Sequence, residues 1–407
     1  MRISVKNLAH IKNAEDIELK NFNIFIGKNG TGKTYFAKLV YFITSIKYKI
    51  QMFNKLFSKK TRYHFDNKSD IQFTSEEQSE FIKEFKNHIK SSFPDFINSK
   101  KELFKTFDFL FDLGINIIDI QYKNEFDTFE EYSSFVTVNF IEKLFSTIES
   151  HYLPAARANY MITYKYLFDS QFNNFRDVLL NKSSTKKISI LPEVENNFLK
   201  DIYRVNTKIR GELYSLGAKI EKNIFRNGKL SIKNPQSQEL PTYEYRLNDL
   251  KQNIDLVTAS SSVTELSPLI MYFRYKIINV KNEMLIIDEP ELSLHPDAQA
   301  QLVSVLVEAV NKGLKIILVT HSPYIIEVLN NHLQRHKIEN YSLDTKLKNF
   351  EPINPNQVGG YLFEDNTIKN ILDEETNLID DKLLNSFNTI NDIYDDMRDV
   401  EWENTHA

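Results

Sequence analysis

The amino-acid sequence predicts an α/β fold in which parallel strands carry polar residues to one edge of a sheet. Residues 27–34 read Gly-Lys-Asn-Gly-Thr-Gly-Lys-Thr and follow a short β-rich run. The apolar run 284–288 ends in Asp288-Glu289, and a second apolar run, 315–319, is followed by Thr320-His321. A helix-like segment comes after each of the three runs, and this alternation is typical of strands that pair in parallel.

Residues 27–34 match the phosphate-binding loop pattern G-x-x-x-x-G-K-[ST]. The strand-like run Asn23–Ile26 precedes the loop and the helix-like run Tyr35–Phe42 follows it. This order directs backbone N–H groups and a helix N-terminus at phosphate oxygens, and glycine permits their close approach. We expect Lys33 to lie against the β- and γ-phosphates and to act in catalysis. The predicted nucleotide-binding residues of the loop are Gly27, Lys28, Asn29, Gly30, Thr31, Gly32, Lys33 and Thr34.

The ends of the other two apolar runs supply candidate catalytic groups. Asp288 is expected to hold Mg²⁺ together with Thr34, and Glu289 to orient or deprotonate the attacking water. His321 can contact the γ-phosphate or that water. Taken alone, Asp288-Glu289 could be a turn with solvated charges and His321 a packing or capping residue. The phosphate loop in the same chain favours the catalytic interpretation, with ATP and Mg²⁺ as cofactors.

Composition narrows the class of protein. The chain of 407 residues has a formal net charge of −4, which argues against bulk nucleic-acid binding. It contains no cysteine, so disulfides and thiolate metal sites are excluded. It begins without the apolar core of a signal peptide and has no apolar run long enough to span a membrane, so we expect a cytoplasmic protein without membrane association. The basic aromatic stretch Lys47–Arg62 could contact nucleic acid, although an amphipathic helix with Phe and Ile packed inward is favoured.

The sequence pattern suggests a core interrupted by helical insertions. Asn227-Gly228, within the alternating run 224–232, predicts a two-residue hairpin, and residues 258–278 resemble a helix behind a serine-rich cap. Further helices are expected at 297–312 and 323–332. The expected divisions are 1–42 (core with the phosphate loop), 43–148 (helical insertion), 149–158 (core), 159–222 (helical arm), 223–345 (core) and 346–407 (acidic C-terminal segment, a possible partner-docking region).

The order of these motifs resembles the OLD-like group of ABC-class ATPases. The resemblance rests on the phosphate loop, on Asp288–Pro296 and on Thr320–Pro323, and covers most of residues 1–30, 150–158 and 255–335. The segment Tyr152–Arg157 also resembles one common in that group. Such ATPases occur in bacterial anti-phage systems such as Septu, PARIS and Gabija and are related to RecF and SMC proteins. The resemblance implies an ABC-type P-loop core with a mixed sheet and a mostly helical insertion.

The resemblance also implies that two subunits sandwich ATP between one phosphate loop and the partner's signature segment. The candidate segment is Ala259–Glu265, with Ser260, Ser261 and Ser262 at the nucleotide. Relatives usually carry glycine where Ser262 stands. A plain helix cap, with Ser262 and Glu265 as a capping box, is the alternative. Arg157 stands where a glutamine-containing loop is usual, and could contact the nucleotide, couple to the insertion or form a surface ion pair.

The implied partners are a second copy of the chain, in a dimer or larger ring, and a separate effector. No nuclease domain is expected in this chain. Asp380-Asp381 and Asp395-Asp396 are interpreted as the solvated face of an amphipathic helix, not a metal site. The leading hypothesis is an ATPase that senses infection and regulates a partner nuclease or toxin in anti-phage defence. A RecF-like or SMC-like DNA-repair ATPase that binds DNA directly and a non-hydrolysing ATP-bound scaffold are the alternatives.

Overall fold

The centre of the molecule is a six-stranded sheet in the order β14-β13-β3-β12-β11-β7. The computed structural model describes residues 1–97, 99, 106–112, 118–120, 128–145, 149–181, 191–225, 228–233, 240–249, 252–338 and 350–379. Five strands of the sheet are parallel and β14 is antiparallel to β13. The predicted α/β fold with a mixed sheet is therefore confirmed. The strands are β3 Phe22–Gly27, β7 Glu149–Leu153, β11 Glu283–Asp288, β12 Lys315–Thr320, β13 Val358–Glu364 and β14 Thr367–Asn370.

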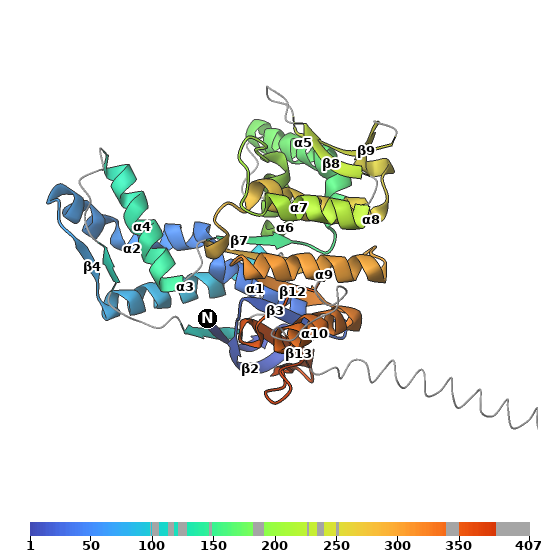
Figure 1. Cartoon of the computed structure of the whole chain (residues 1–407). Helices are drawn as coiled ribbons and strands as arrows, with labels where there is room; N and C mark the ends of the chain where they lie inside the picture. Colours follow the sequence, from blue (N-terminus) through green and yellow to red (C-terminus); the bar gives the residue numbers. More distant parts are fainter. Residues whose placement is uncertain are drawn as a thin grey trace, which may run out of the picture.

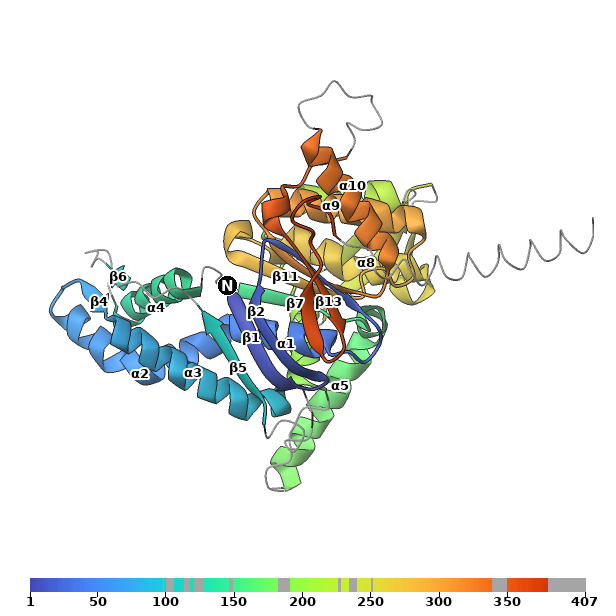
Figure 2. The same ribbon diagram turned by 90° about the horizontal axis from the view of Figure 1, so that it is seen from below.

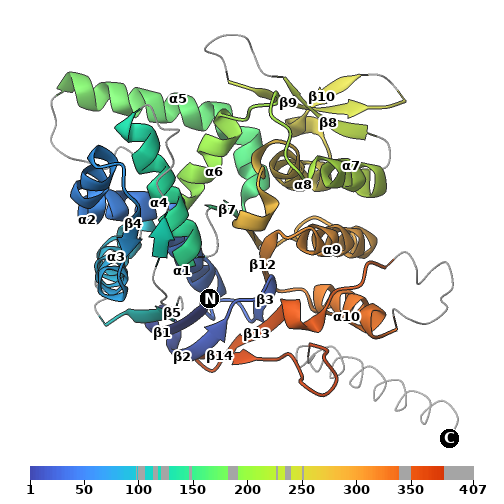
Figure 3. The same ribbon diagram turned by 60° about the vertical axis from the view of Figure 1, so that its left-hand side comes forward.

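Helices cover both faces of this sheet, which is why its strands read as nearly continuous apolar runs. Along β12, Ile316 and Leu318 pack into one core and Ile317 and Val319 into the other. Helix α1 lies on one side of the strands, and α9 and α10 lie on the other (Figure 3). These helices span Lys33–Thr44, Pro296–Asn311 and Pro323–Lys337. The expected strands and helices of this region lie within a few residues of the observed ones.

A second, antiparallel sheet in the order β2-β1-β5 flanks the phosphate-loop side of the core. Its strands are β1 Arg2–Leu8, β2 Ile11–Glu18 and β5 Asp108–Asp112. Strand β5 comes from the stretch between the two core segments, so this insertion is joined to the core by backbone pairing. The rest of the insertion projects to one side as three helices and a small β pair (Figure 1). They are α2 Ile46–Asp66, β4 Ile71–Phe73, α3 Ser75–Phe96, β6 Ile118–Ile120 and α4 Phe129–Phe145.

The basic aromatic stretch 47–62 lies in α2 and is amphipathic. Its apolar side chains, among them Phe53 and Phe57, are buried. The ring of Phe140 from α4 lies 5.1 Å from that of Phe53. Three of its cationic side chains bind acids of neighbouring elements: Lys47–Glu193 at 2.7 Å, Lys55–Glu84 at 3.3 Å and Lys60–Glu77 at 2.7 Å. The interpretation as a helix with an inward aromatic face is confirmed.

A third layer of helices and a small antiparallel sheet lies over the β7 and β11 side of the core. Helix α5 extends away from the core (Figure 2). This layer contains α5 Arg157–Asn181, α6 Glu193–Tyr203, α7 Tyr214–Ile220 with a π-turn Glu221–Phe225, β8 Gly228–Lys233, β9 Thr242–Leu247, β10 Asn253–Asp255, a 3₁₀ turn Leu256–Thr258 and α8 Ser261–Met271 with a π-turn Tyr272–Lys276. Two further 3₁₀ turns, Val280–Asn282 and Pro355–Gln357, complete the described elements.

The hairpin predicted at Asn227-Gly228 is wrong. The residues before it continue α7 as a π-turn, and β8 pairs with β9 instead. The buried Glu221 explains the difference, because its carboxylate accepts the Leu230 N–H at 2.7 Å and forms an ion pair with Arg274. These contacts anchor Glu221–Phe225 as helix, where the hairpin would require a strand. Asn227 itself lies outside the described residues.

The expected boundary at residue 345 is also wrong. Strand β13 lies directly beside β3, so part of the segment 346–407 belongs to the core and not to a separate acidic tail. Its apolar run Val358–Phe363 is buried on both faces. Phe363 packs against Phe25 and Phe36, with ring centroids 5.4 Å and 5.8 Å apart. The paired aspartates at 380–381 and 395–396, and the amphipathic helix predicted around them, lie outside the described residues.

No helix among the described residues has the length and apolar character needed to cross a membrane.

Candidate nucleotide-binding site

The chemistry-bearing residues meet because three neighbouring strands end at the same edge of the sheet. Strand β12 lies between β3 and β11 and is parallel to both. The phosphate loop leaves β3, Thr320-His321 follow β12, and Asp288-Glu289 end β11. Ligands of open α/β sheets bind at the carboxyl ends of such strands. The structure therefore brings Lys33, Thr34, Asp288, Glu289 and His321 together.

The phosphate loop has the backbone conformation that its glycines allow. Gly27, Gly30 and Gly32 have φ values of 148°, 77° and 100°. A Cβ at Gly27 would overlap the carbonyl oxygen of Phe363 on the neighbouring strand β13. Helix α1 begins directly after Gly32, so its first-turn N–H groups face the loop. Glycine at position 27 is thus required by both backbone geometry and strand packing.

Lys33 is buried and folds back over the loop. Its Nζ donates hydrogen bonds to the carbonyl oxygens of Gly27 at 2.8 Å and Lys28 at 2.7 Å. Burial lowers the pKa of Lys33 to about 8, although the nearby Asp288 and Glu289 oppose this shift. An anionic phosphate at the loop would favour the charged form of this amine.

Asp288 is a buried carboxyl group with hydroxyl donors around it. The Tyr152 hydroxyl donates to Oδ2 at 3.0 Å, and the Thr34 side chain is also hydrogen-bonded to the carboxylate. Burial raises the pKa of Asp288 to about 6, and the adjacent Glu289 adds to this shift. Carboxylate and hydroxyl oxygens are ligands suited to Mg²⁺, which completes its shell with water and phosphate. Thr34 and Asp288 therefore fit a magnesium ion bound together with a nucleotide.

Glu289 has a strained backbone that its neighbours hold in place. Its φ is 49°, in the left-handed region that non-glycine residues seldom adopt. Its N–H donates to the Val319 carbonyl at 2.7 Å, and its own carbonyl accepts from Arg157 at 3.0 Å. Its carboxylate is partly exposed and lies 3.8 Å from His321 Nε2. Such enforced geometry is common at functional sites.

His321 lies between the phosphate loop and Glu289. Burial and the nearby Lys33 lower its pKa, which favours a neutral imidazole at pH 7, while a hydrogen bond to the Gly27 carbonyl opposes the shift. Glu291 fixes the backbone here, because its Oε1 accepts from the His321 N–H at 2.8 Å and from Thr320 Oγ1 at 2.7 Å. No motif in the sequence points to Glu291, because its contacts depend on the pairing of β11 with β12.

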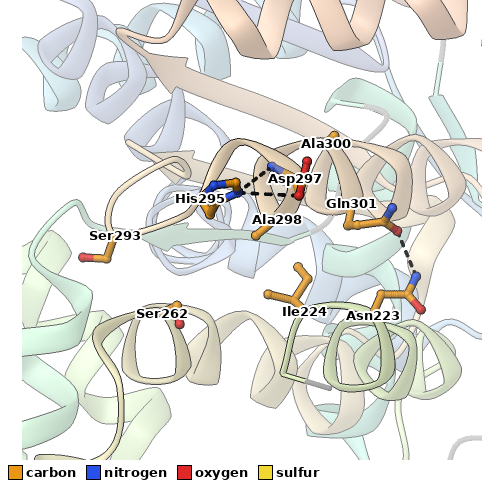
Figure 4. Close-up of a pocket in the computed structure, with 9 residues that line it drawn as sticks. All are labelled: Asn223, Ile224, Ser262, Ser293, His295, Asp297, Ala298, Ala300 and Gln301. Atoms are coloured by element: carbon orange, nitrogen blue, oxygen red, sulfur yellow. Dashed lines mark hydrogen bonds and ion pairs between the residues drawn. The ribbon is translucent and has the colours of Figure 1, made fainter. Parts of the chain in front are cut away.

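Ser262 of the serine segment lines a separate cleft. Helix α8 begins at Ser261 and Ser260 is its N-cap. The Ser260 side chain caps no N–H of the helix and is hydrogen-bonded to Ser262 Oγ at 3.1 Å instead. Ser262 faces a cleft of about 940 Å³ that it shares with Ser293 and His295 (Figure 4). No residue of the phosphate loop, all of which the structure describes, lines this cleft. The other lining residues are Asn223, Ile224, Asp297, Ala298, Ala300 and Gln301.

Two expectations about this region are wrong. Ser262 and Glu265 form no capping box, because the N-cap is Ser260, two positions before Ser262, and the Glu265 carboxylate lies 3.2 Å from Arg157 Nε. Arg157 forms no surface ion pair, since only 1% of it is exposed. Its guanidinium group instead contacts the C-terminal end of β11 and the first turns of α8. Neither feature can be seen in the sequence, because both depend on the packing of α5 against α8.

The described residues contain no group of three or more His, Asp or Glu side chains that could hold a metal ion by themselves. A strand–loop–helix phosphate site, an acidic strand end and a neighbouring strand-end histidine together define a P-loop ATPase. The sequence profile of the AAA ATPase domain matches residues 1–326, and the chain belongs to that family.

Other comparisons add little. No curated protein sequence matches the chain. Among solved structures, an Smc head bound to the C-winged helix domain of ScpA is 11% identical, with 91% of this chain and 96% of that chain covered and a TM-score of 0.38. An Smc head with an extended coiled coil, bound to the C-terminal domain of ScpA from Pyrococcus furiosus, is 13% identical. That match covers 91% of this chain and 95% of that chain, with a TM-score of 0.35. An SMC head domain from Thermotoga maritima is 11% identical, with 91% of this chain and 98% of that chain covered and a TM-score of 0.33. TM-scores this low support no inference about function.

Replacing Asp288 with asparagine should stabilise the nucleotide-free protein at pH 7.5. The carboxyl pKa is raised from 3.8 to about 6, so the folded state bears a cost of up to about 3 kcal/mol once the group is ionised. This cost is absent below about pH 4 and grows as the pH rises through 6. The stabilisation that Asp288→Asn produces should be roughly half as large at pH 5 as at pH 7.5.

Denaturant unfolding of the wild type and Asp288→Asn at pH 5 and 7.5 measures this gain. Asp297→Asn is the control, because its side chain is 77% exposed and its charge is solvated. A loss of stability in Asp288→Asn at pH 7.5 would contradict the assignment of Asp288 as a desolvated carboxylate.

Proposed function

We propose that this chain binds Mg-ATP and hydrolyses it at a site shared between two copies. The observation that carries the proposal is a division of the site. Lys33, Asp288 and Glu289 converge at one sheet edge, whereas Ser262, at the start of α8, lines a cleft that no phosphate-loop residue lines. Each chain thus offers two incomplete halves, and a head-to-tail dimer would join them.

The residues at the sheet edge have distinct roles in this proposal. Thr34 and Asp288 would hold the magnesium ion, which would neutralise phosphate charge. Lys33 exchanges its carbonyl partners for β- and γ-phosphate oxygens. Glu289 orients the attacking water and accepts its proton, and His321, neutral and near Glu289, contacts the γ-phosphate or the water. Phosphoryl transfer depends mainly on this positioning and charge neutralisation.

The partner's contribution comes from Ser260, Ser261 and Ser262. They begin an eleven-residue helix whose first N–H groups have no side-chain cap. Such a helix N-terminus favours a γ-phosphate placed against it. Ser293 follows the catalytic strand, has a φ of 59° and lines the same cleft as Ser262. The surface that meets the second nucleotide is therefore connected to the catalytic strand of its own chain.

Mixing two inactive variants tests the shared site. Lys33→Ala removes the phosphate-loop amine, and Ser262→Arg blocks the serine segment, so each homodimer should lack ATPase activity. A mixed dimer has one intact composite site, and random pairing gives about a quarter of the sites of the wild type. Phosphate release by the mixture should therefore rise well above that of either variant.

The control for this experiment is Lys33→Ala mixed with Asp288→Asn, whose defects lie in the same half-site, so that no intact site can form. If the Lys33→Ala and Ser262→Arg mixture stays as inactive as this control, the two-chain site is wrong.

We further propose that the ATPase senses infection and regulates a separate nuclease or toxin in anti-phage defence. This proposal is supported by the order of the motifs along the chain, which resembles that of the OLD-like ATPases in such systems. A DNA-repair ATPase that binds DNA directly is less supported, because Lys47, Lys55 and Lys60 of α2 bind acidic side chains. A non-hydrolysing scaffold remains the alternative suggested by Ser262, where relatives carry glycine.

Glu289→Gln should hold the ATP-bound assembly together, so a tagged Glu289→Gln protein is expected to retain its effector in ATP. Affinity purification from the native host, with mass spectrometry and nucleic-acid staining, measures this. The control is the doubly substituted Lys33→Ala, Glu289→Gln protein, which should not form the ATP-bound state. A near-stoichiometric nuclease or toxin retained by the single variant alone supports the defence role. DNA without such a protein contradicts it and favours repair.

A further inference from the structure

Arg157 is a buried cation whose guanidinium group contacts three separate parts of the core. Its Nη1 donates to the carbonyl oxygens of Asp288 at 2.7 Å and Pro154 at 3.3 Å. Its Nη2 donates to the Glu289 carbonyl at 3.0 Å. Its Nε donates to the Glu265 carbonyl at 3.1 Å and lies 3.2 Å from the Glu265 carboxylate.

These acceptors come from elements that the proposed mechanism must coordinate. Asp288 and Glu289 carry the metal-binding and water-activating carboxylates at the end of β11. Glu265 lies in the first turns of α8, three residues after Ser262, which lines the cleft. Pro154 follows β7, which pairs with β11. The guanidinium is thus a direct link between the catalytic strand end and the helix that meets the second nucleotide.

The link is stiff for two reasons. A guanidinium is a planar fork with fixed donor directions, so its hydrogen bonds define both the distance and the orientation of its acceptors. The backbone at Glu289 is strained, with a φ of 49°, and keeps this conformation only while its surroundings enforce it. The Val319 carbonyl holds its N–H, and Arg157 holds its carbonyl.

We propose that Arg157 is a positioning residue that fixes Glu289 relative to α8, so that docking of α8 on a second nucleotide sets the position of the catalytic carboxylate. This rests on the proposed two-chain site. Arg157 itself touches neither the water nor the phosphates in this account. It acts through the backbone of Asp288 and Glu289.

A second buried arginine provides a matched control. Arg274, 6% exposed, forms an ion pair with the buried Glu221 and donates to the Leu230 carbonyl at 3.3 Å. It lies in the π-turn that continues α8, and these two partners belong to α7's π-turn and β8, away from the strand ends. Loss of either arginine leaves a buried glutamate without its cation and should lower the melting temperature. Only Arg157 contacts the catalytic strand.

The experiment compares Arg157→Met and Arg274→Met for melting temperature, affinity for a fluorescent ATP analogue, and kcat and KM for ATP. Both variants should melt at lower temperature than the wild type. Arg157→Met should bind the analogue nearly as well as the wild type but lose kcat on the order of 10-fold to 100-fold, because a small displacement of a catalytic group has effects of this size. Arg274→Met should keep kcat.

Arg157→Lys separates positioning from stability. Lysine restores a cation beside Glu265 but offers one nitrogen in place of the fork, so the melting temperature should recover while kcat stays low. Ser262→Ala adds a test of coupling. It should lower kcat in the Arg274→Met background and have little further effect in the Arg157→Met background.

The proposal is overturned if kcat of Arg157→Met equals that of Arg274→Met, or if kcat recovers along with the melting temperature in Arg157→Lys. If Arg157→Met does not fold, Arg157→Lys and Glu265→Gln carry the same comparison. Failure of the Lys33→Ala and Ser262→Arg mixture would instead refute the two-chain site. The kcat of the Arg157 variants would then still report on the hold of Arg157 on Glu289.

Discussion

The candidate site depends on the parallel pairing of β3, β12 and β11. Their common direction places a lysine, two carboxylates and a histidine at one edge of a sheet whose interior is mostly apolar. Burial of these charged groups is unfavourable, and it shifts their pKa values. Burial lowers the pKa of Lys33 to about 8 and raises that of Asp288 to about 6. Both charged forms are disfavoured in the free protein, and a magnesium ion and a triphosphate would supply the charges that they lack.

Much of this edge could be predicted from the sequence, because the signals for it lie in short continuous segments of the chain. Strands buried on both faces appear as short apolar runs, and the polar residues at their ends stand out against them. Residues 284–288 and 315–319 are of this kind. The observed strand β11 begins one residue earlier than the first run, and β12 ends one residue later than the second. The phosphate loop is recognisable because the chain is poor in glycine elsewhere.

What the sequence did not show is determined by long-range pairing. Strand β13 completes the sheet beside β3, although the segment that contains it was interpreted as an acidic tail. Tyr152 and Glu291 act on Asp288 and His321 through contacts between strands that are distant in the sequence. Glu221 holds Glu221–Phe225 as helix by binding Leu230 and Arg274, where the predicted hairpin required a strand. No periodicity or spacing in the chain indicates these contacts in advance.

Arg157 connects the end of strand β11 with the start of helix α8. The phosphate loop and the serine segment belong to different surfaces, and a two-chain site requires that events at one surface reach the other. A buried guanidinium between Glu265 and the Asp288–Glu289 backbone is a physical connection of this kind, and its acceptors are main-chain atoms that any side-chain motif would miss. The strained backbone at Glu289 makes that connection sensitive to small movements of α8.

In the proposed mechanism, Glu289 activates water for ATP hydrolysis at this edge of the sheet. Steady-state phosphate release by the purified wild-type protein and by Glu289→Gln, at saturating Mg-ATP, is the measurement that decides this role. We expect turnover by the wild type and a loss of roughly 100-fold or more in the variant, with nucleotide affinity retained. Unchanged turnover in Glu289→Gln would remove Glu289 as the catalytic base, and absence of turnover in the wild type would contradict hydrolysis itself.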